Sequence, residues 1–372
     1  MKSFDLKTKK VERILLIRLR NIGDVLLTVP TIRAFREAFP RAFIAALVNA
    51  GTEEMLTENP LLDKVLVFNP EWKKLPFWQR LKKEMSFLWN VRKRKFDLAI
   101  NLTEGDRGAF ICLVSGAPEK IGLAKKDRSL WWKRLVFTYM LPMPEGNLHI
   151  VDQILKVPQS LGLDPRDKRV EVFYSQEDKE FIDQLLQQEG VGPQDPLVHV
   201  HPTARWLFKC WRDEGMARVI DELQATGKVR VVLTGGGEKK ELEKIDRILE
   251  YCQTHPLNLA GRMNLKQLAA LSQRCRFFIG VDTAPMHIAA AVGTPVIALF
   301  GPSGEVNWGP WGHGHVVIKK DLECRPCGRD GCQGSKKSRC LEEISEEEVL
   351  LEAFRFLAND HHIAMEKDDP KR

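Results

Sequence analysis

The sequence has 372 residues and a formal net charge of +7, with 44% hydrophobic and 29% charged residues. This length predicts two domains of ordinary size, each able to bury its own core. No segment approaches the roughly 18 uninterrupted apolar residues of a membrane-spanning helix, and the polar residues 1–10 precede no signal-type apolar run, which predicts a soluble, cytoplasmic chain.

The first predicted element is an apolar strand over Arg13–Arg18. A polar turn with Gly23 and Asp24 follows it, and a helix is predicted from Val25 to about Phe39. The turn holds a single glycine, so it is not the G-x-G-x-x-G fingerprint of dinucleotide-binding folds. Asp24 stands where a carboxylate could reach into a ligand site, although an aspartate at a helix start is commonly an N-cap. The residues alone leave both roles open.

The other elements of the first half predict a parallel sheet with crossover helices. Further strands are predicted at Ala42–Val48, Lys64–Phe68, Phe96–Leu102 and Lys120–Leu123. The polar segment Asp164–Val170 contains Pro165 and marks the expected end of the first domain.

The segment Glu71–Phe96 is strongly basic and aromatic. Residues 1–170 hold 31 Lys and Arg against 19 Asp and Glu, whereas residues 171–372 hold 26 against 31, so the first half is predicted to meet an anionic partner. Within the segment, nine basic side chains alternate with large apolar ones: Lys73, Lys74, Arg80, Lys82, Lys83, Arg92, Lys93, Arg94 and Lys95, with Trp72, Phe77, Trp78, Phe87, Leu88 and Trp89.

Two interpretations fit this segment. Its composition is typical of a helix at an anionic membrane surface, and equally of a surface helix whose aromatic side chains pack inward. No helix-turn-helix, zinc-finger or RNA-recognition signature accompanies it, which disfavours nucleic acid as the partner.

The second half begins the alternation of strands and helices again, which predicts a second α/β domain. Strands are predicted at Leu197–Val200, Val229–Leu233 and Leu257–Met263, and helices before Thr226 and over Leu265–Ser272. Polar or glycine-rich turns follow several of these strands. The carboxyl edge of such a sheet is the expected ligand cleft.

Two of these turns carry candidate ligand contacts. The loop after Val200 contains Thr203, Arg205 and Lys209, whose hydroxyl and cations could contact a pyrophosphate. Ordinary solvation of Lys209 is the simpler alternative. The turn Gly235–Gly237 would let the backbone approach a nucleotide closely, with Glu238 just beyond it to accept from ribose hydroxyls, although three glycines also make a plain tight turn.

The stretch Phe277–Phe300 is the one around which the rest is organised. It is predicted as a strand over Phe277–Ile279, a helix over Met286–Val292 and a strand over Pro295–Phe300. Asp282 or Thr283 can cap the helix and Pro285 can occupy its first turn, so the helix start would present backbone N–H groups to an anion. Asp282, Thr283 and His287 together favour a sugar phosphate over bare phosphate. The alternative is an ordinary capped helix without a ligand.

The eight cysteines fall into two groups. Cys112, Cys210, Cys252 and Cys275 are scattered and are expected to be reduced thiols. The others share one loop with the spacing C-x2-C-x4-C-x7-C: Cys324, Cys327, Cys332 and Cys340. Four thiols match the ligand count of structural zinc, although the spacing is not that of paired knuckles. A zinc site, reduced thiols and a redox-dependent disulfide remain open here.

Two motifs together resemble the ADP-heptose:lipopolysaccharide heptosyltransferases. One is R-L-R-N-I-G-D-V-L-L-T-V-P at Arg18–Pro30, and the other is F-I-G-V-D-T-A-P-M-H-I-A-A-A-V-G-T-P-V-I-A-L-F-G-P at Phe278–Pro302. The similarity spans about Arg13–Glu352. The segment P-T-A-R-W-L-F-K-C-W and the cysteine-bearing tail resemble the branch that adds the third heptose of the inner core. The resemblance implies an inverting, metal-independent glycosyltransferase with the GT-B fold, in which two Rossmann-like domains with parallel sheets face a central cleft.

Carried over residue by residue, the resemblance makes Asp24 the general base, facing the cleft from the first domain. Lys209 matches the lysine that holds the donor's phosphates, and Thr203 matches the hydroxyl beside it. In the family the lysine loop is more polar than Trp206–Phe208 are here.

The same resemblance places the donor at the second domain's helix start. Asp282 is expected on the heptose hydroxyls, and the backbone N–H groups of Thr283 and Ala284 on the pyrophosphate. Ala284 stands where the family often has glycine. Met263 falls where the family contacts adenine through its backbone, and Glu238 near where it binds ribose.

The expected organisation is an acceptor-binding domain over residues 1–168, an ADP-heptose-binding domain over 169–345, and a C-terminal helix that packs back across the domains, followed by a frayed tail, over 346–372. The expected partners are ADP-heptose as donor, a lipid A–core oligosaccharide as acceptor, and an anionic membrane surface reached through residues 71–96. The chain is expected to act without a cofactor, as a monomer peripheral to the inner face of the inner membrane. The rivals are another nucleotide-sugar enzyme of this fold, such as an epimerase, and a non-catalytic anionic-lipid-binding protein.

Overall fold

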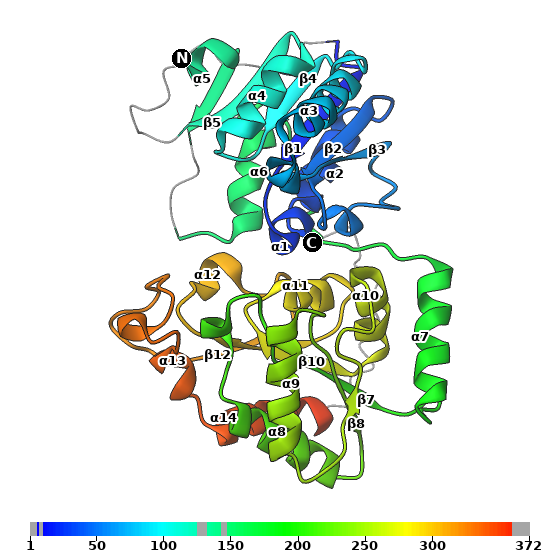
Figure 1. Ribbon diagram of the computed structural model, residues 1–372, viewed down its shortest axis with the longest axis vertical. Coiled ribbons are helices and arrows are strands. Elements are labelled where there is room, and N and C mark those ends of the chain that lie inside the picture. Colours follow the sequence, from blue (N-terminus) through cyan, green and yellow to red (C-terminus); the bar gives the residue numbers. More distant parts are fainter. Residues whose placement is uncertain (1–5, 7–9, 125–131, 143–146, 359–372) are drawn as a thin grey trace. The chain divides into compact units, whose positions relative to one another are not determined.

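The computed structural model describes residues 6, 10–124, 132–142 and 147–358, and Figure 1 shows their elements. The chain forms two compact units, Met1–Asp178 and Lys179–Arg372. Each is built on a six-stranded parallel sheet, which confirms the expected α/β class with two parallel sheets. No helix within the described ranges is long and apolar enough to cross a bilayer. The tail that was predicted to fray, from about Asp360, lies outside the described residues.

The sheet of the first unit has the order β3-β2-β1-β4-β5-β6. Its strands are β1 (Arg13–Arg18), β2 (Phe43–Asn49), β3 (Lys64–Phe68), β4 (Leu98–Asn101), β5 (Glu119–Ala124) and β6 (Tyr139–Pro142). The central strands β1, β2 and β4 are nearly all apolar, because helices cover both faces of a parallel sheet. The sequence did not predict β6, a four-residue edge strand that ends in proline.

Helices and turns of 3₁₀ helix connect these strands. They are α1 (Ile22–Leu26), α2 (Val29–Ala38), η2 (Glu53–Met55), η3 (Pro70–Lys74), α3 (Phe77–Arg92), α4 (Asp106–Ser115), α5 (Lys133–Val136) and α6 (Ile150–Ser160). Helices α3 and α4 pack on each other, and so do α2 and α6.

The single helix predicted over residues 25–39 is wrong, because the structure has two helices there. Helix α1 ends at Leu26, and α2 begins at Val29 with Pro30 in its first turn. Proline has no backbone N–H, and its ring clashes with the carbonyl four residues earlier, so the first helix cannot continue through Pro30. Asp24 therefore lies on a separate, short helix directly after β1.

The sheet of the second unit has the order β12-β11-β10-β7-β8-β9. Its strands are β7 (Leu197–His201), β8 (Arg230–Leu233), β9 (Leu257–Asn258), β10 (Phe277–Val281), β11 (Val296–Phe300) and β12 (Val316–Lys319). Strand β9 is shorter than the predicted 257–263. The side chain of Asn258 accepts a hydrogen bond from the Ala260 N–H, and this local turn ends the strand.

The other elements of this half are α7 (Gln176–Gln188), η5 (Leu207–Lys209), α8 (Asp213–Ala225), α9 (Lys239–Tyr251), α10 (Leu265–Arg274), α11 (Ala284–Ala291), α12 (Glu305–Trp308), η6 (Cys332–Gly334), α13 (Arg339–Glu342) and α14 (Glu346–Ala358). Helix α14 was expected to pack across the domains. Its apolar side chains, among them Val349 and Ala353, are part of the core of the second unit, where α14 packs on α8, β11 and β12.

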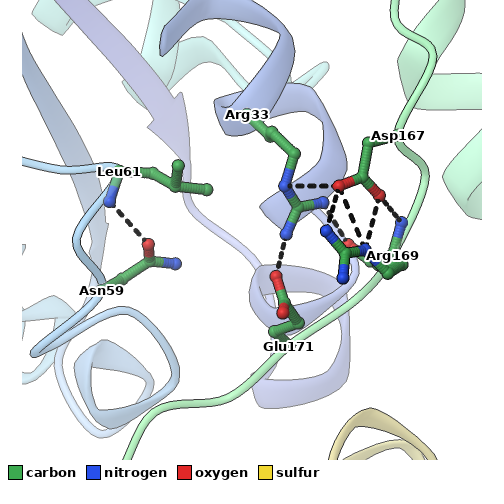
Figure 2. Close-up of polar contacts among 6 residues, drawn as sticks. All are labelled: Arg33, Asn59, Leu61, Asp167, Arg169 and Glu171. Atoms are coloured by element: carbon green, nitrogen blue, oxygen red, sulfur yellow. Dashed lines mark hydrogen bonds and ion pairs between the residues drawn. The ribbon is translucent and has the colours of Figure 1, made fainter. Parts of the chain in front are cut away.

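The segment predicted to end the first domain is held against α2 by Arg33 (Figure 2). This buried arginine donates a hydrogen bond to the Arg169 carbonyl (2.5 Å), lies 3.4 Å from Asp167 and forms an ion pair with Glu171. Residues 167–171 therefore belong structurally to the first unit, which extends to Asp178.

Candidate functional site

Three of the predicted site residues, Asp24, Lys209 and Asp282, lie at the switch point of their own sheets. Strand β1 lies between β2 and β4, and strand β7 lies between β8 and β10, so in each sheet the strand order reverses beside the unit's first strand. Ligands of open parallel sheets bind outside the carboxyl ends of the strands at this point. Asp24 follows β1, Lys209 follows β7 and Asp282 follows β10.

In the first unit, Asp24 is buried and paired with Arg18, the last residue of β1. The Arg18 Nη2 donates to Asp24 Oδ1 at 3.0 Å, and the Arg18 Nη1 donates to the Leu102 carbonyl beyond β4 at 2.5 Å. One guanidinium thus ties the carboxylate to the ends of both strands that flank the switch point. Arg20 adds a longer ion pair to the same oxygen, at 3.9 Å.

This pairing leaves Asp24 suited to accept a proton at one oxygen. Among the described residues, every side-chain contact of Asp24 goes to Oδ1, so Oδ2 has no protein partner. Burial lowers the pKa of Arg18 to about 10, while the charge of Asp24 opposes that decrease, so Arg18 stays a cation near neutral pH. Arg18 is part of the sequence motif, but the sequence did not predict that it positions Asp24. That role depends on its hydrogen bond to Leu102, which is distant in the sequence.

In the second unit, Lys209 and Asp282 form an ion pair. Strands β7 and β10 are hydrogen-bonded neighbours, with His201 opposite Gly280, so the loops that follow them start side by side. The Lys209 Nζ lies 2.5 Å from Asp282 Oδ2, and both side chains are largely buried. The Lys209 ammonium also lies 5.5 Å from the centre of the Trp206 ring, a cation–π distance. Two predicted site residues that lie 73 positions apart in the sequence are thus in direct contact.

The start of helix α11 lies next to this pair. Thr283 is its N-cap in extended geometry, but the Thr283 side chain makes no capping hydrogen bond. Ala284 and Pro285 form the first turn. Because a helix start carries partial positive charge and N–H donors, this end and Lys209 together offer an anion two kinds of favourable partner.

Thr203 belongs to a buried hydrogen-bond network instead of an open ligand surface. Its hydroxyl donates to Glu241 Oε2 at 2.7 Å and lies 3.3 Å from His201 Nε2. The Thr234 hydroxyl continues the network, at 2.8 Å from His201 and 2.7 Å from His199. Thr203 is fully buried, so its hydroxyl supports the loop that ends at Lys209.

Glu241 is a supporting residue that the sequence interpretation missed. Its Oε2 also accepts a hydrogen bond from the Gly236 N–H at 3.1 Å, and a Cβ added at Gly236 would lie 2.8 Å from Glu241 Oε1. The carboxylate therefore links the glycine turn after β8 to the loop after β7. An acidic residue in the first turn of a helix was the available signal, but that pattern by itself indicates only a favourable helix start.

The pKa of His201 is lowered to about 3 by burial, and burial lowers the pKa of His199 well below its usual value, with His201 adding to the decrease. An unfolded chain binds a proton at these positions below about pH 6.5, whereas the folded chain does not. The two histidines should therefore have little effect on the free energy of unfolding above pH 6.5. Below that pH they should lower it progressively as the pH falls toward 3.

We expect His201→Asn to make this acid destabilisation less steep. One histidine with a lowered pKa should reduce the free energy of unfolding by about 2–3 kcal/mol between pH 6.5 and 4.5. The measurement is urea unfolding of wild type and variant at both pH values. The variant should lose less stability than wild type over this interval, and His255→Asn, at an exposed histidine, should lose as much as wild type. Equal losses for all three proteins would contradict the assignment.

The remaining predicted residues occupy different positions. Met263 is half-buried in the turn between β9 and α10, and Glu238 is the N-cap of α9, with an exposed side chain near Lys240. His287 is buried within α11. Glu238 and Met263 both follow the carboxyl ends of their strands, on the β8–β9 side of the switch point, and Met263 lies beyond the shortened β9 and not within a strand as predicted.

The four tail cysteines line one cavity of about 350 Å³, together with Arg329 and Arg339. Cys324 and Cys332 are exposed, Cys340 is buried, and burial raises the pKa of the Cys340 thiol. In the described part of the chain, no group of three or more His, Cys, Asp or Glu side chains is arranged to hold a metal ion.

Comparisons with known proteins agree on one family. Residues 85–337 match the model of glycosyltransferase family 9 (heptosyltransferase). Lipopolysaccharide heptosyltransferase 3 of Escherichia coli is 35% identical over 295 residues, which cover 79% of this chain and 85% of that protein.

Solved structures agree on the fold. A glycosyl transferase family 9 protein from Veillonella parvula has a TM-score of 0.80 at 24% identity, covering 96% of this chain and 98% of that one. The ADP-heptose lipopolysaccharide heptosyltransferase II of E. coli has a TM-score of 0.73 at 20% identity, covering 93% and 98%.

Proposed function

The chain belongs to glycosyltransferase family 9, the heptosyltransferase family, and we propose that it transfers heptose from ADP-heptose to the inner core of lipopolysaccharide. The specific reaction we propose is addition of the third heptose onto the second, as the name of the E. coli relative at 35% identity suggests. The observation that carries the proposal is the contact of Lys209 with Asp282 at the start of α11, at the switch point of the second sheet.

The second unit is suited to hold the donor. A nucleoside diphosphate carries its negative charge on the diphosphate, and Lys209 with the uncapped start of α11 offers a cation and N–H donors to it. Asp282 is an acceptor for hydroxyl groups of the attached sugar. In this role the carboxylate binds sugar on one side and keeps Lys209 in place on the other.

The first unit supplies the base. Asp24 Oδ2 takes the proton of the acceptor hydroxyl as that oxygen attacks the anomeric carbon, while the bond from that carbon to the diphosphate breaks on the opposite face. Arg18 holds the carboxylate in position through Oδ1. One displacement inverts the anomeric configuration.

The leaving diphosphate gains negative charge as the sugar departs. Lys209 and the helix start lie ready to stabilise that charge, so the proposed mechanism needs no metal ion. The lipid-anchored acceptor would place this reaction at the inner face of the cytoplasmic membrane.

A direct assay tests the proposal. The enzyme is incubated with ADP-heptose and core lipid that ends at the second heptose, and the lipid is analysed by mass spectrometry. We expect a mass increase of one heptose and release of ADP in equal amount, and no product with UDP-sugars. If the mass of this acceptor stays unchanged but a shorter core is extended, the chain transfers heptose to an earlier position of the core than the one proposed. No extension of any core would overturn the proposal.

A further inference from the structure

Helix α3 exposes a continuous row of large apolar side chains. Phe77, Leu81, Met85 and Trp89 recur every four residues and therefore share one face of the helix, and Trp78 lies beside them. The exposed fractions are 67% for Phe77, 76% for Trp78, 57% for Met85 and 68% for Trp89. We call these five side chains the α3 row.

The core of the first unit does not need this row. Trp72 and Phe87 pack edge-to-face with each other and with Phe68, and Leu88 also packs on the core. The inward face of the segment is thus complete. This packing confirms the inward-facing interpretation for Trp72, Phe87 and Leu88, and it leaves the exposed side chains of α3 to be explained.

The neighbouring helix extends the apolar surface. Helix α4 packs on α3, and its Phe110 and Leu113 are exposed one turn apart. Figure 1 shows α3 and α4 together on one face of the first sheet. Large exposed apolar side chains gathered on two neighbouring helices favour an interaction site.

Unpaired positive charge lies on the same helix as the row and at its C-terminal end. Lys82, Lys83 and Lys93 are exposed, and in the described ranges none of them forms an ion pair. The two acidic residues of the segment are already engaged, Glu71 by Lys74 and Glu84 by Arg80 and Arg107. Helix α3 thus carries exposed aromatic side chains together with cations that form no ion pair among the described residues; by helical spacing Lys82 lies beside the row and Lys83 lies farthest from it.

We propose that this face of α3 and α4 binds the surface of an anionic lipid bilayer. Tryptophan and phenylalanine at headgroup depth bury apolar area, while the flanking lysines contact lipid phosphates. A second copy of the chain fits less well, because a symmetric dimer would bring the same unpaired lysines against each other. The proposal does not depend on heptose transfer.

Sedimentation with lipid vesicles tests it. The protein should sediment with phosphatidylglycerol vesicles and much less with phosphatidylcholine vesicles. Added salt should release it from the phosphatidylglycerol vesicles. Changing Lys82, Lys83 and Lys93 to alanine should weaken binding by about a hundredfold, since one lysine near an anionic surface contributes about fivefold. The double change Trp78→Ser and Trp89→Ser removes apolar area instead of charge, so it should weaken vesicle binding at every salt concentration tested.

Matched controls lie in the second unit. Leu351→Ser changes an exposed apolar side chain, and Lys228→Ala with Lys239→Ala changes exposed lysines, so these proteins should bind as wild type does. Thermal unfolding shows whether each variant is folded. Vesicle binding that the α3 variants leave unchanged would overturn the proposal. If the wild-type protein does not bind vesicles but dimerises with increasing concentration, and the tryptophan variant does not dimerise, the face binds a second copy of the chain instead.

Discussion

Asp24→Asn is expected to lower the rate of heptose transfer by about a thousandfold or more, with ADP binding nearly unchanged. An amide cannot take the acceptor's proton, and general base catalysis is worth roughly 10²–10⁴-fold. Asparagine keeps the size of the side chain and an oxygen that can accept from Arg18, so the fold should persist. Transfer of labelled heptose gives the rate, and calorimetric titration with ADP gives the affinity.

The control for this variant is Asp164→Asn, at an exposed carboxylate of the same unit, which should transfer heptose at the wild-type rate. If Asp24→Asn kept more than about a tenth of the wild-type rate, Asp24 would not be the base. If it lost ADP affinity in parallel with its rate, the residue would act on the donor instead.

Lys209→Ala is expected to lower kcat/KM for ADP-heptose by about 10²–10³-fold. The change removes the cation that stabilises the departing diphosphate, an effect of the size seen when one donor to a developing anion is removed. It also leaves the Asp282 carboxylate, which is 8% exposed, without its cation. This unpaired negative charge should repel the phosphates of the donor. Initial rates over a range of donor concentrations measure the loss.

A double variant separates these two effects. Lys209→Ala with Asp282→Asn should bind ADP more tightly than Lys209→Ala alone, because no unpaired carboxylate then repels the diphosphate. Lys228→Ala, at an exposed lysine of the same unit, should behave as wild type. Wild-type kinetics in Lys209→Ala would remove the lysine from the donor site.

The sequence predicted the two-sheet architecture because buried parallel strands give apolar runs that local patterns reveal. The limits of β1 and β3 were predicted correctly, whereas the edge strands β6 and β12 were missed. Both missed strands are only four residues long with a single buried residue, so their sequences carry less of this signal than the five-residue edge strand β3. The division of α1 from α2 was also missed, because the predicted helix placed Pro30 in its interior, where proline breaks or kinks a helix.

The site was predictable where a motif sits at a strand end, and less so where it depends on contacts distant in sequence. Asp282 and Lys209 were named separately, and their ion pair follows from the pairing of β7 with β10. The burial of Thr203 against Glu241, 38 residues later, could not be inferred from either segment. On α3, composition alone could not decide which aromatic side chains face the core, because that choice depends on where the helix begins.

The ion pair between Lys209 and Asp282 has a consequence for the end of each catalytic cycle. In the proposed mechanism, Asp282 loses its contact with the sugar once heptose has left, while its ion pair with Lys209 remains and competes with ADP for that cation. Product inhibition by ADP should therefore be mild in the native enzyme. In this mechanism the carboxylate would favour the release of ADP, so that turnover would continue as ADP accumulates.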